Sequence, residues 1–326
     1  MINQTANKIV SKNIEENSSK GSMTEPFHGL LLVRKQAGLT SHDLVDQVRR
    51  VFHTKSVGHC GTLDPMASGL MVLLIGEATK LSNYILEQDK AYRLRAQLGL
   101  VTDTLDTTGV ILKTEKVDLS EDKVRETAIC LQGELTLPVP MYSAVKIGGI
   151  RMHEFARKGE AIEAPVRMMR FYDFKNFKQG TDWIEFDMGC SKGSYVRAWI
   201  HEFGQKLGCG AAMSALERTG SAPYSITQAH TIEEISECFA RGEISEYLLP
   251  MEVALPNYKF IRLSGLDETL FSNGQISYGL KSQLISIFKP GLDEGVKVLS
   301  RSTGKLMGLV GIESGKGFVI RRVFKY

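Results

Sequence analysis

The sequence lacks a hydrophobic run long enough to cross a bilayer. Its longest uncharged apolar stretch covers only residues 69–76, whereas a transmembrane helix needs about 20 residues. The N-terminus also lacks the apolar stretch of a signal peptide, so we expect a cytoplasmic protein that neither enters a membrane nor is secreted. Hydrophobic residues make up 43% and charged residues 24% of the 326 residues. This composition excludes wholesale disorder and a fibrous chain.

Cysteine is scarce and irregularly spaced. The five cysteines stand at positions 60, 130, 190, 209 and 238, without a Cys-x-x-Cys pair. We therefore expect reduced, partly buried thiols and no metal site. The sequence also lacks a phosphate loop of the form Gly-x-x-x-x-Gly-Lys-Ser/Thr, and no Gly-x-Gly-x-x-Gly run follows a strand. No nucleotide or other small-molecule cofactor is predicted.

Positive charge is concentrated near the C-terminus. Residues 251–326 contain 11 Lys and Arg against 6 Asp and Glu, a net charge of +5 in a chain that totals +3. Such a segment suits binding to a polyanion, although a lysine-rich solvated surface explains the charge equally well. In the same region short apolar segments, residues 284–288 among them, are separated by glycines, which is typical of a small β-barrel.

The length and the patterning predict two domains after a flexible N-terminal tail over residues 1–26. Residues 92–98 alternate apolar and polar side chains, the pattern of a half-buried strand. Residues 41–52 place apolar side chains on one helical face, with Ser41 as the expected N-cap. Strands and helices of this kind, interspersed over residues 27–250, predict an α+β domain with a mixed, mainly antiparallel sheet. Residues 251–326 are predicted to form a small C-terminal β-barrel.

The densest functional pattern is the loop from Gly58 to Gly69, Gly-His-Cys-Gly-Thr-Leu-Asp-Pro-Met-Ala-Ser-Gly. Its glycines allow the backbone to approach a ligand closely, and Pro65 holds Asp64 in an extended conformation. A carboxylate held stiffly beside His59 can act as a nucleophile or a base. On the residues alone, an Asp that only caps a turn before Pro65 is the more frequent arrangement.

This loop closely resembles the catalytic-loop motif of the TruB family of pseudouridine synthases. Further segments resemble the family's other motifs in the same order, over about residues 29–224. They are Gly38-Leu39-Thr40-Ser41, Lys90-Ala91-Tyr92, Asp103 to Gly109, Tyr142-Ser143-Ala144-Val145-Lys146, Cys190 to Arg197 and Leu216-x-Arg218-Thr219. A looser likeness to the family's PUA RNA-binding domain covers about residues 255–326. The resemblance implies a pseudouridine synthase catalytic domain over 27–250 and a PUA-like domain over 251–326.

The resemblance implies that the protein converts a uridine in RNA to pseudouridine. The bond from N1 to C1′ breaks and a bond from C5 to C1′ forms, so substrate and product are isomers and no cofactor or metal is needed. The family's substrate is the T-loop uridine of tRNA, position 55, which makes the tRNA T stem-loop the expected partner. Nothing in the sequence demands more than a monomer.

The catalytic residues implied by the resemblance are Asp64, Tyr92 and Arg197. Asp64 is the nucleophile, adding either to C1′ of the ribose or to C6 of the base. Arg197 pairs with Asp64 through charge-assisted hydrogen bonds. Tyr92 stacks on the flipped uracil and is a candidate for proton transfer. On the residues alone, Arg197 is more often a helix-surface ion pair and Tyr92 a core tyrosine.

The substrate-binding residues implied by the resemblance are His59, Tyr92, Tyr195 and Leu216. Tyr195 and Leu216 line the pocket for the base, and His59 enters the RNA where the nucleotide has left its stack. Several charged residues between 146 and 170 are candidate phosphate contacts or parts of a solvated face. The basic ones are Lys146, Arg151, Arg157, Lys158, Arg167 and Arg170, and the acidic ones are Glu154, Glu160 and Glu163.

Three other functions remain open at this point. One is a tRNA-binding folding chaperone in which catalysis is secondary. Another is a guide-RNA-dependent pseudouridine synthase that acts on ribosomal RNA. The last is a glycoside hydrolase, which ranks lowest because that class uses a second carboxylate at a defined separation, and no such partner of Asp64 stands out.

Overall fold

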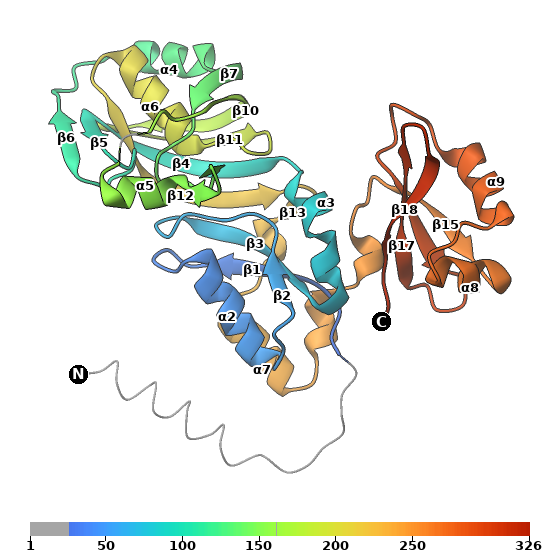
Figure 1. The fold of residues 1–326 in the computed structure, drawn as a ribbon. Coiled ribbons are helices and arrows are strands. Elements are labelled where there is room, and N and C mark those ends of the chain that lie inside the picture. Colours follow the sequence, from blue (N-terminus) through green and yellow to red (C-terminus); the bar gives the residue numbers. More distant parts are fainter. Residues whose placement is uncertain (1–25, 161) are drawn as a thin grey trace.

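The structure is a computed structural model that describes residues 26–160 and 162–326, so the predicted tail lies almost entirely outside the described residues. A ten-stranded sheet and a four-stranded sheet organise the chain. In Figure 1 the four-stranded sheet and its helices stand to one side of the larger sheet. No helix within the described ranges is long and apolar enough to span a membrane.

The large sheet confirms the prediction of a mixed, mainly antiparallel sheet. Its strand order is β14-β1-β3-β12-β4-β11-β10-β7, with β2 paired to β3 and β13 to β12. The pair formed by β3 and β12 is parallel and the other pairs are antiparallel. The bounds are β1 Gly29–Lys35, β2 Val57–His59, β3 Ser68–Ile75, β4 Lys90–Leu98, β7 Gly133–Pro138, β10 Val166–Gln179, β11 Trp183–Cys190, β12 Ala211–Ser221, β13 Tyr224–Ser225 and β14 Leu248–Leu249.

Helices and short strands complete this part of the chain. The helices are α2 Ser41–Val51, α3 Ser82–Leu86, α4 Glu121–Cys130, α5 Met152–Lys158, α6 Val196–Leu207 and α7 Ile232–Ala240, with short 3-10 turns η1 Gly76–Leu81, η2 Ile226–Gln228, η3 Ile244–Glu246 and η4 Met251–Val253. Two hairpins pair β5 Leu100–Thr102 with β6 Ile111–Thr114 and β8 Lys146–Ile147 with β9 Ile150–Arg151.

The N-cap of α2 differs from the prediction. Thr40, not Ser41, caps the helix: its hydroxyl accepts from the Asp43 amide at 3.1 Å, and the Asp43 carboxylate accepts from the Thr40 amide at 2.9 Å. Together they form a capping box. Ser41 is thereby released for a different bond, described below.

Helix α6 is fixed to the sheet by aromatic packing. Trp199 is fully buried, stacks on Phe203 at 5.1 Å between ring centroids and meets Phe186 edge-on at 5.4 Å. The indole Nε1 donates to the Leu131 carbonyl at 3.1 Å, which satisfies its one polar group. This anchoring fixes the first turn of α6, where Arg197 lies.

The five cysteines are free thiols, four of them buried, as expected.

The C-terminal sheet is open rather than a closed barrel. Its order is β15-β16-β17-β18, so within the described residues β15 and β18 are its edges. The prediction of a strand over residues 284–288 is wrong, because they lie mostly in α9, capped by Ser277 and burying Leu280 and Leu284 four residues apart. The bounds are β15 Lys259–Leu263, α8 Leu266–Ser272, α9 Tyr278–Ile287, β16 Val296–Ser300, β17 Leu306–Glu313 and β18 Gly317–Val323.

The parallel contact between β3 and β12 requires a glycine. Gly69 lies opposite Arg218 in this pair, with φ +112°. A Cβ atom at position 69 would overlap the backbone of Arg218. Both the backbone conformation and the close approach therefore exclude larger residues.

We predict that Gly69→Ala destabilises the fold more than Gly133→Ala. Gly133 also has a positive φ, +104°, but a Cβ there meets nothing within 4 Å. It therefore incurs only the backbone strain of about 1–2 kcal/mol, whereas Gly69→Ala adds a clash with the backbone. The midpoints of urea unfolding of the two variants test this, and equal midpoints would contradict it.

Candidate active site

The loop between β2 and β3 is held against the start of α2. The Ser41 hydroxyl accepts from the Leu63 amide at 2.9 Å and donates to the Leu63 carbonyl at 3.0 Å. The Gly38 amide donates to the Pro65 carbonyl at 2.8 Å. Ser41 is buried, so these bonds are shielded from water. They fix the backbone on both sides of Asp64.

A buried lysine supports the same loop. The side chain of Lys35 at the end of β1 is inaccessible to solvent, and its Nζ donates to the carbonyls of Ala67 at 2.6 Å and Pro65 at 3.3 Å. Burial and, to a lesser extent, the nearby charge of Arg218 lower the pKa of Lys35 to about 8. The sequence analysis missed this residue. Strand alternation after the buried Leu31 and Val33 was the available signal.

Asp64 and Arg197 form a two-point ion pair. Arg197 Nε lies 2.9 Å from Asp64 Oδ2, and Arg197 Nη2 donates to Asp64 Oδ1 at 3.3 Å. The Arg197 side chain is 6% exposed, whereas that of Asp64 is 34% exposed. The carboxylate is thus held from the protein side by a guanidinium fork and stays open to a ligand on the other side.

Two further loops also bind the Arg197 guanidinium. Nη1 donates to the Thr104 carbonyl at 3.0 Å, Nη2 donates to the Tyr142 carbonyl at 2.9 Å, and Nη1 lies 3.8 Å from Asp106 Oδ2. The buried Asp106 is itself fixed by the Thr104 hydroxyl at 2.8 Å. Arg197 therefore has little freedom to leave Asp64. The sequence analysis assigned residues 103–109 to a motif but gave Asp106 no role.

Tyr92 and Tyr195 lie within range of the Asp64 charge. Tyr92 on β4 stands opposite Arg218 of β12, and burial raises its pKa to about 12 while Arg218 opposes the shift. Tyr195 is the N-cap residue of α6, and burial raises its pKa as well. In both cases the Asp64 carboxylate adds to the upward shift of the pKa. Both phenols are therefore protonated at neutral pH.

His59 and Leu216 lie on strands that border the loop. His59 ends β2, burial lowers its pKa, and its Nδ1 is buried without a hydrogen-bond partner among the described residues. Leu216 on β12 stands opposite Leu94 of β4 and is 7% exposed. Of the predicted residues, Asp64 and Arg197 are in direct contact, and Tyr92 and Tyr195 lie within range of the Asp64 charge.

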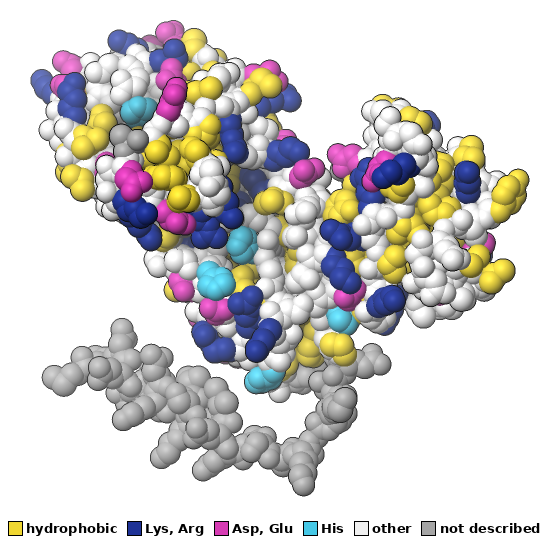
Figure 2. Space-filling view, in the orientation of Figure 1, with side chains coloured by type: hydrophobic (Ala, Val, Ile, Leu, Met, Phe, Trp, Pro, Cys, Tyr) yellow, Lys and Arg dark blue, Asp and Glu magenta, His cyan; other side chains and the backbone are white. Residues whose placement is uncertain are grey.

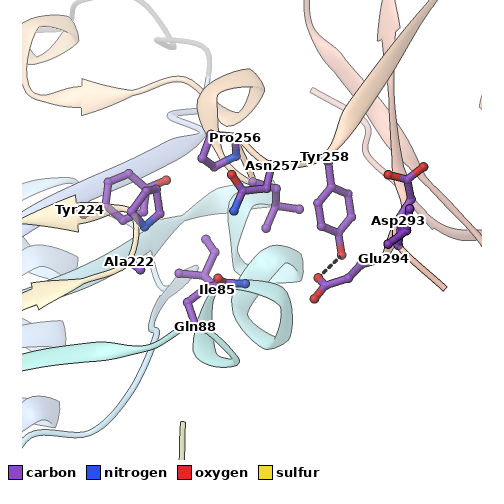
Figure 3. A pocket seen from close by; sticks show the side chains of 12 residues that line it. Ile85, Gln88, Ala222, Tyr224, Pro256, Asn257, Tyr258, Asp293 and Glu294 are labelled. Atoms are coloured by element: carbon purple, nitrogen blue, oxygen red, sulfur yellow. Dashed lines mark hydrogen bonds between the residues drawn. The ribbon is translucent and has the colours of Figure 1, made fainter. Parts of the chain in front are cut away.

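A separate pocket of about 280 Å³ lies at the junction with the C-terminal sheet (Figure 3). The Tyr258 hydroxyl faces Glu294 Oε2 at 3.3 Å in its wall. The other lining residues are Ile85, Gln88, Ala222, Pro223, Tyr224, Leu255, Pro256, Asn257, Leu292 and Asp293. It contains none of the predicted catalytic or substrate-binding residues.

Comparisons with known proteins identify the relatives of this chain. The description "TruB family pseudouridylate synthase (N terminal domain)" matches residues 49–196, and "tRNA pseudouridylate synthase B C-terminal domain" matches residues 197–256. A protein of Bdellovibrio bacteriovorus named tRNA pseudouridine synthase B is 52% identical over 92% of this chain and 98% of its own. Its namesake in Clostridium tetani is 38% identical over 76% and 85% of the two chains.

Solved structures share the fold. One titled as an H/ACA RNP bound to a substrate RNA containing 2′-deoxyuridine has a TM-score of 0.67 at 18% identity, over 96% of this chain and 93% of that one. A Cbf5-Nop10-Gar1 complex has a TM-score of 0.65 at 21% identity, over 95% and 91%. The family models and the named relatives make the chain an enzyme of the isomerase class. The chain belongs to the TruB family of pseudouridine synthases.

We predict that Lys35 contributes a rise in stability with pH. Its folded pKa of about 8 lies below the unfolded value of about 10.4. Between these values the unfolded chain binds more protons, so the free energy of unfolding rises with pH, by at most about 1.4 kcal/mol per unit from this group.

Urea unfolding of the wild type and Lys35→Met at several pH values tests this prediction. The free energy of unfolding of the wild type minus that of Lys35→Met should increase from pH 8 to pH 10. Lys206→Met, which removes an exposed lysine of α6, serves as the control and should give a constant difference. A constant difference for Lys35→Met as well would contradict the prediction.

Proposed function

We propose that this enzyme isomerises the T-loop uridine of tRNA, position 55, to pseudouridine, with Asp64 as the nucleophile on a flipped-out base. The observation that carries the proposal is the two-point pair between Asp64 and a buried Arg197, in a loop that resembles the family's catalytic motif. The names of the relatives support tRNA as the substrate.

In this mechanism Asp64 and Arg197 serve the bond changes, and Tyr92 serves the proton transfer. Asp64 attacks at C1′ or C6 while Arg197 aims both of its oxygens. The N1–C1′ bond breaks, the C5–C1′ bond forms, C5 loses its proton and N1 gains one. Tyr92 stacks on the uracil, and because its pKa is raised to about 12 it takes part as a neutral phenol that donates or relays a proton.

The remaining predicted residues hold the RNA. Tyr195 and the buried Leu216 form walls for the extruded base. His59, neutral because burial lowers its pKa, takes the space that the nucleotide leaves in its stack. An uncharged imidazole can insert there without pairing to a phosphate.

Basic side chains supply the phosphate contacts. Figure 2 shows Lys and Arg side chains on both sides of the hollow between the lobe that carries α5 and the C-terminal lobe. We assign residues 27–250 as the catalytic domain and residues 251–326 as a PUA-like RNA-binding domain. The enzyme acts as a monomer in the cytoplasm. RNA binding across both parts should weaken steeply with salt.

We predict that Asp64→Asn abolishes isomerisation while tRNA binding persists. The assay is tritium release from a tRNA transcript labelled at uridine C5, because the new C5–C1′ bond expels that hydrogen. The rate should fall by at least about 10³-fold, since a nucleophile is removed. Asp187→Asn is the matched control, because Asp187 Oδ1 also pairs with an arginine, Arg93, at 2.9 Å, but this arginine is half exposed whereas Arg197 is buried.

The same assay separates the alternatives. A transcript with cytidine in place of the T-loop uridine should release no tritium. A folded wild type that binds tRNA without release would indicate a folding chaperone, and release that needs an added guide RNA would indicate the guide-dependent class. Full activity of Asp64→Asn would remove the nucleophile from the proposal.

A further inference from the structure

A second buried arginine spans the loop that carries Asp64. The Arg218 side chain is 1% exposed. Its Nε donates to the Leu70 carbonyl at 2.7 Å, Nη2 donates to the Gly61 carbonyl at 3.2 Å, and Nη1 donates to the Thr62 carbonyl at 3.4 Å. One guanidinium therefore binds the backbone just before the catalytic loop's Asp64 and again just after the loop enters β3.

The charge of Arg218 has no carboxylate partner in the part of the chain that the structure describes. Its contacts are the three carbonyls and the Met71 sulfur at 2.8 Å. A buried cation without an anion is costly, and an apolar side chain of similar volume often stabilises such a position more. Filling space therefore does not explain an arginine here. What a guanidinium adds is a rigid planar fork of N–H donors that can hold several carbonyls at once.

Arg218 also stands beside the other reacting group. On β12 it lies opposite Tyr92 of β4 on one side and opposite Gly69 of β3 on the other. The missing Cβ of Gly69 allows the backbone of Arg218 to approach the end of the loop. A single residue thus contacts both ends of the Asp64 loop and neighbours the tyrosine strand.

We propose that Arg218 is a positioning residue for the reaction: by clamping the carbonyls of Gly61, Thr62 and Leu70 it fixes the Asp64 loop relative to Tyr92. This proposal rests on the proposed roles of Asp64 and Tyr92. Arg197 and Arg218 then have different tasks. Arg197 binds the carboxylate itself, and Arg218 holds the backbone that carries it.

The test is the single-turnover rate of tritium release at saturating tRNA for the wild type, Arg218→Lys and Arg218→Gln. Lysine keeps the charge but loses the fork, and glutamine keeps one donor group. Each variant should bind tRNA with wild-type affinity and lose roughly 100-fold in rate, because a displacement of about 1 Å in a reacting group costs that much. The temperature is kept well below each variant's unfolding transition.

Lys297→Met is the matched control for losing a buried cation. Lys297 is 6% exposed and, among residues 26–160 and 162–326, donates only to the carbonyls of Glu252 and Ala254, far from the loop in sequence. It should lose stability and keep the single-turnover rate. Amide hydrogen exchange gives a second readout: both Arg218 variants should speed exchange in residues 60–68 and leave β16 and β17 unchanged.

The outcomes separate this proposal from the proposed function. A silent wild type overturns the function on which the proposal rests. An active wild type with Arg218 variants of equal rate and unchanged exchange overturns the positioning role alone. Variants that lose rate only in proportion to their unfolded fraction also overturn it, because Arg218 would then serve stability and not the placement of Asp64.

Discussion

The site depends on backbone carbonyls that accept hydrogen bonds from buried cations. The Asp64 loop has little regular secondary structure of its own, so its shape must come from outside. Lys35 reaches it from β1 and Arg218 reaches it from β12. Hydrogen bonds to charged groups contribute about 1.5–3 kcal/mol each, more than neutral ones. These bonds therefore give the loop a shape that its own backbone does not supply.

These cations also shape the electrostatics of the site. Burial, with the charge of Arg218 as the second cause, lowers the pKa of both Lys35 and Lys90 to about 8. Like charges gathered under one loop repel each other, and a polyanion brought to the surface above them relieves that repulsion. The cations that hold the loop thus also make the surface above it more favourable for an anion.

Local sequence patterns correctly predicted the elements that bury one regular face. The alternation in β4 and the apolar face of α2 both emerged as expected, because each buries one face of a regular element. The α9 region was misassigned because a short apolar run fits a strand or a buried helix equally well, and the cap at Ser277 distinguishes them.

The residues of the site were only partly predictable from the sequence. Asp64 and Arg197 followed from motif resemblance, and their pairing is seen in the geometry. The roles of Lys35, Asp106 and Arg218 did not follow, because each acts on backbone atoms or partners distant in sequence. Every residue has a backbone carbonyl, so no pattern of residue types shows which carbonyls will accept a hydrogen bond from a distant side chain.

The sequence distance between the loop and its arginines has a consequence during synthesis. Arg197 is 133 residues from Asp64, and Arg218 is 148 residues from Leu70. At ribosomal rates of about 5–20 residues per second, Asp64 emerges roughly 7–30 seconds before the second arginine is made. Through that interval the nascent chain carries Asp64 without the two arginines that hold it and its loop. The site therefore cannot take its final geometry until most of the large sheet has been translated.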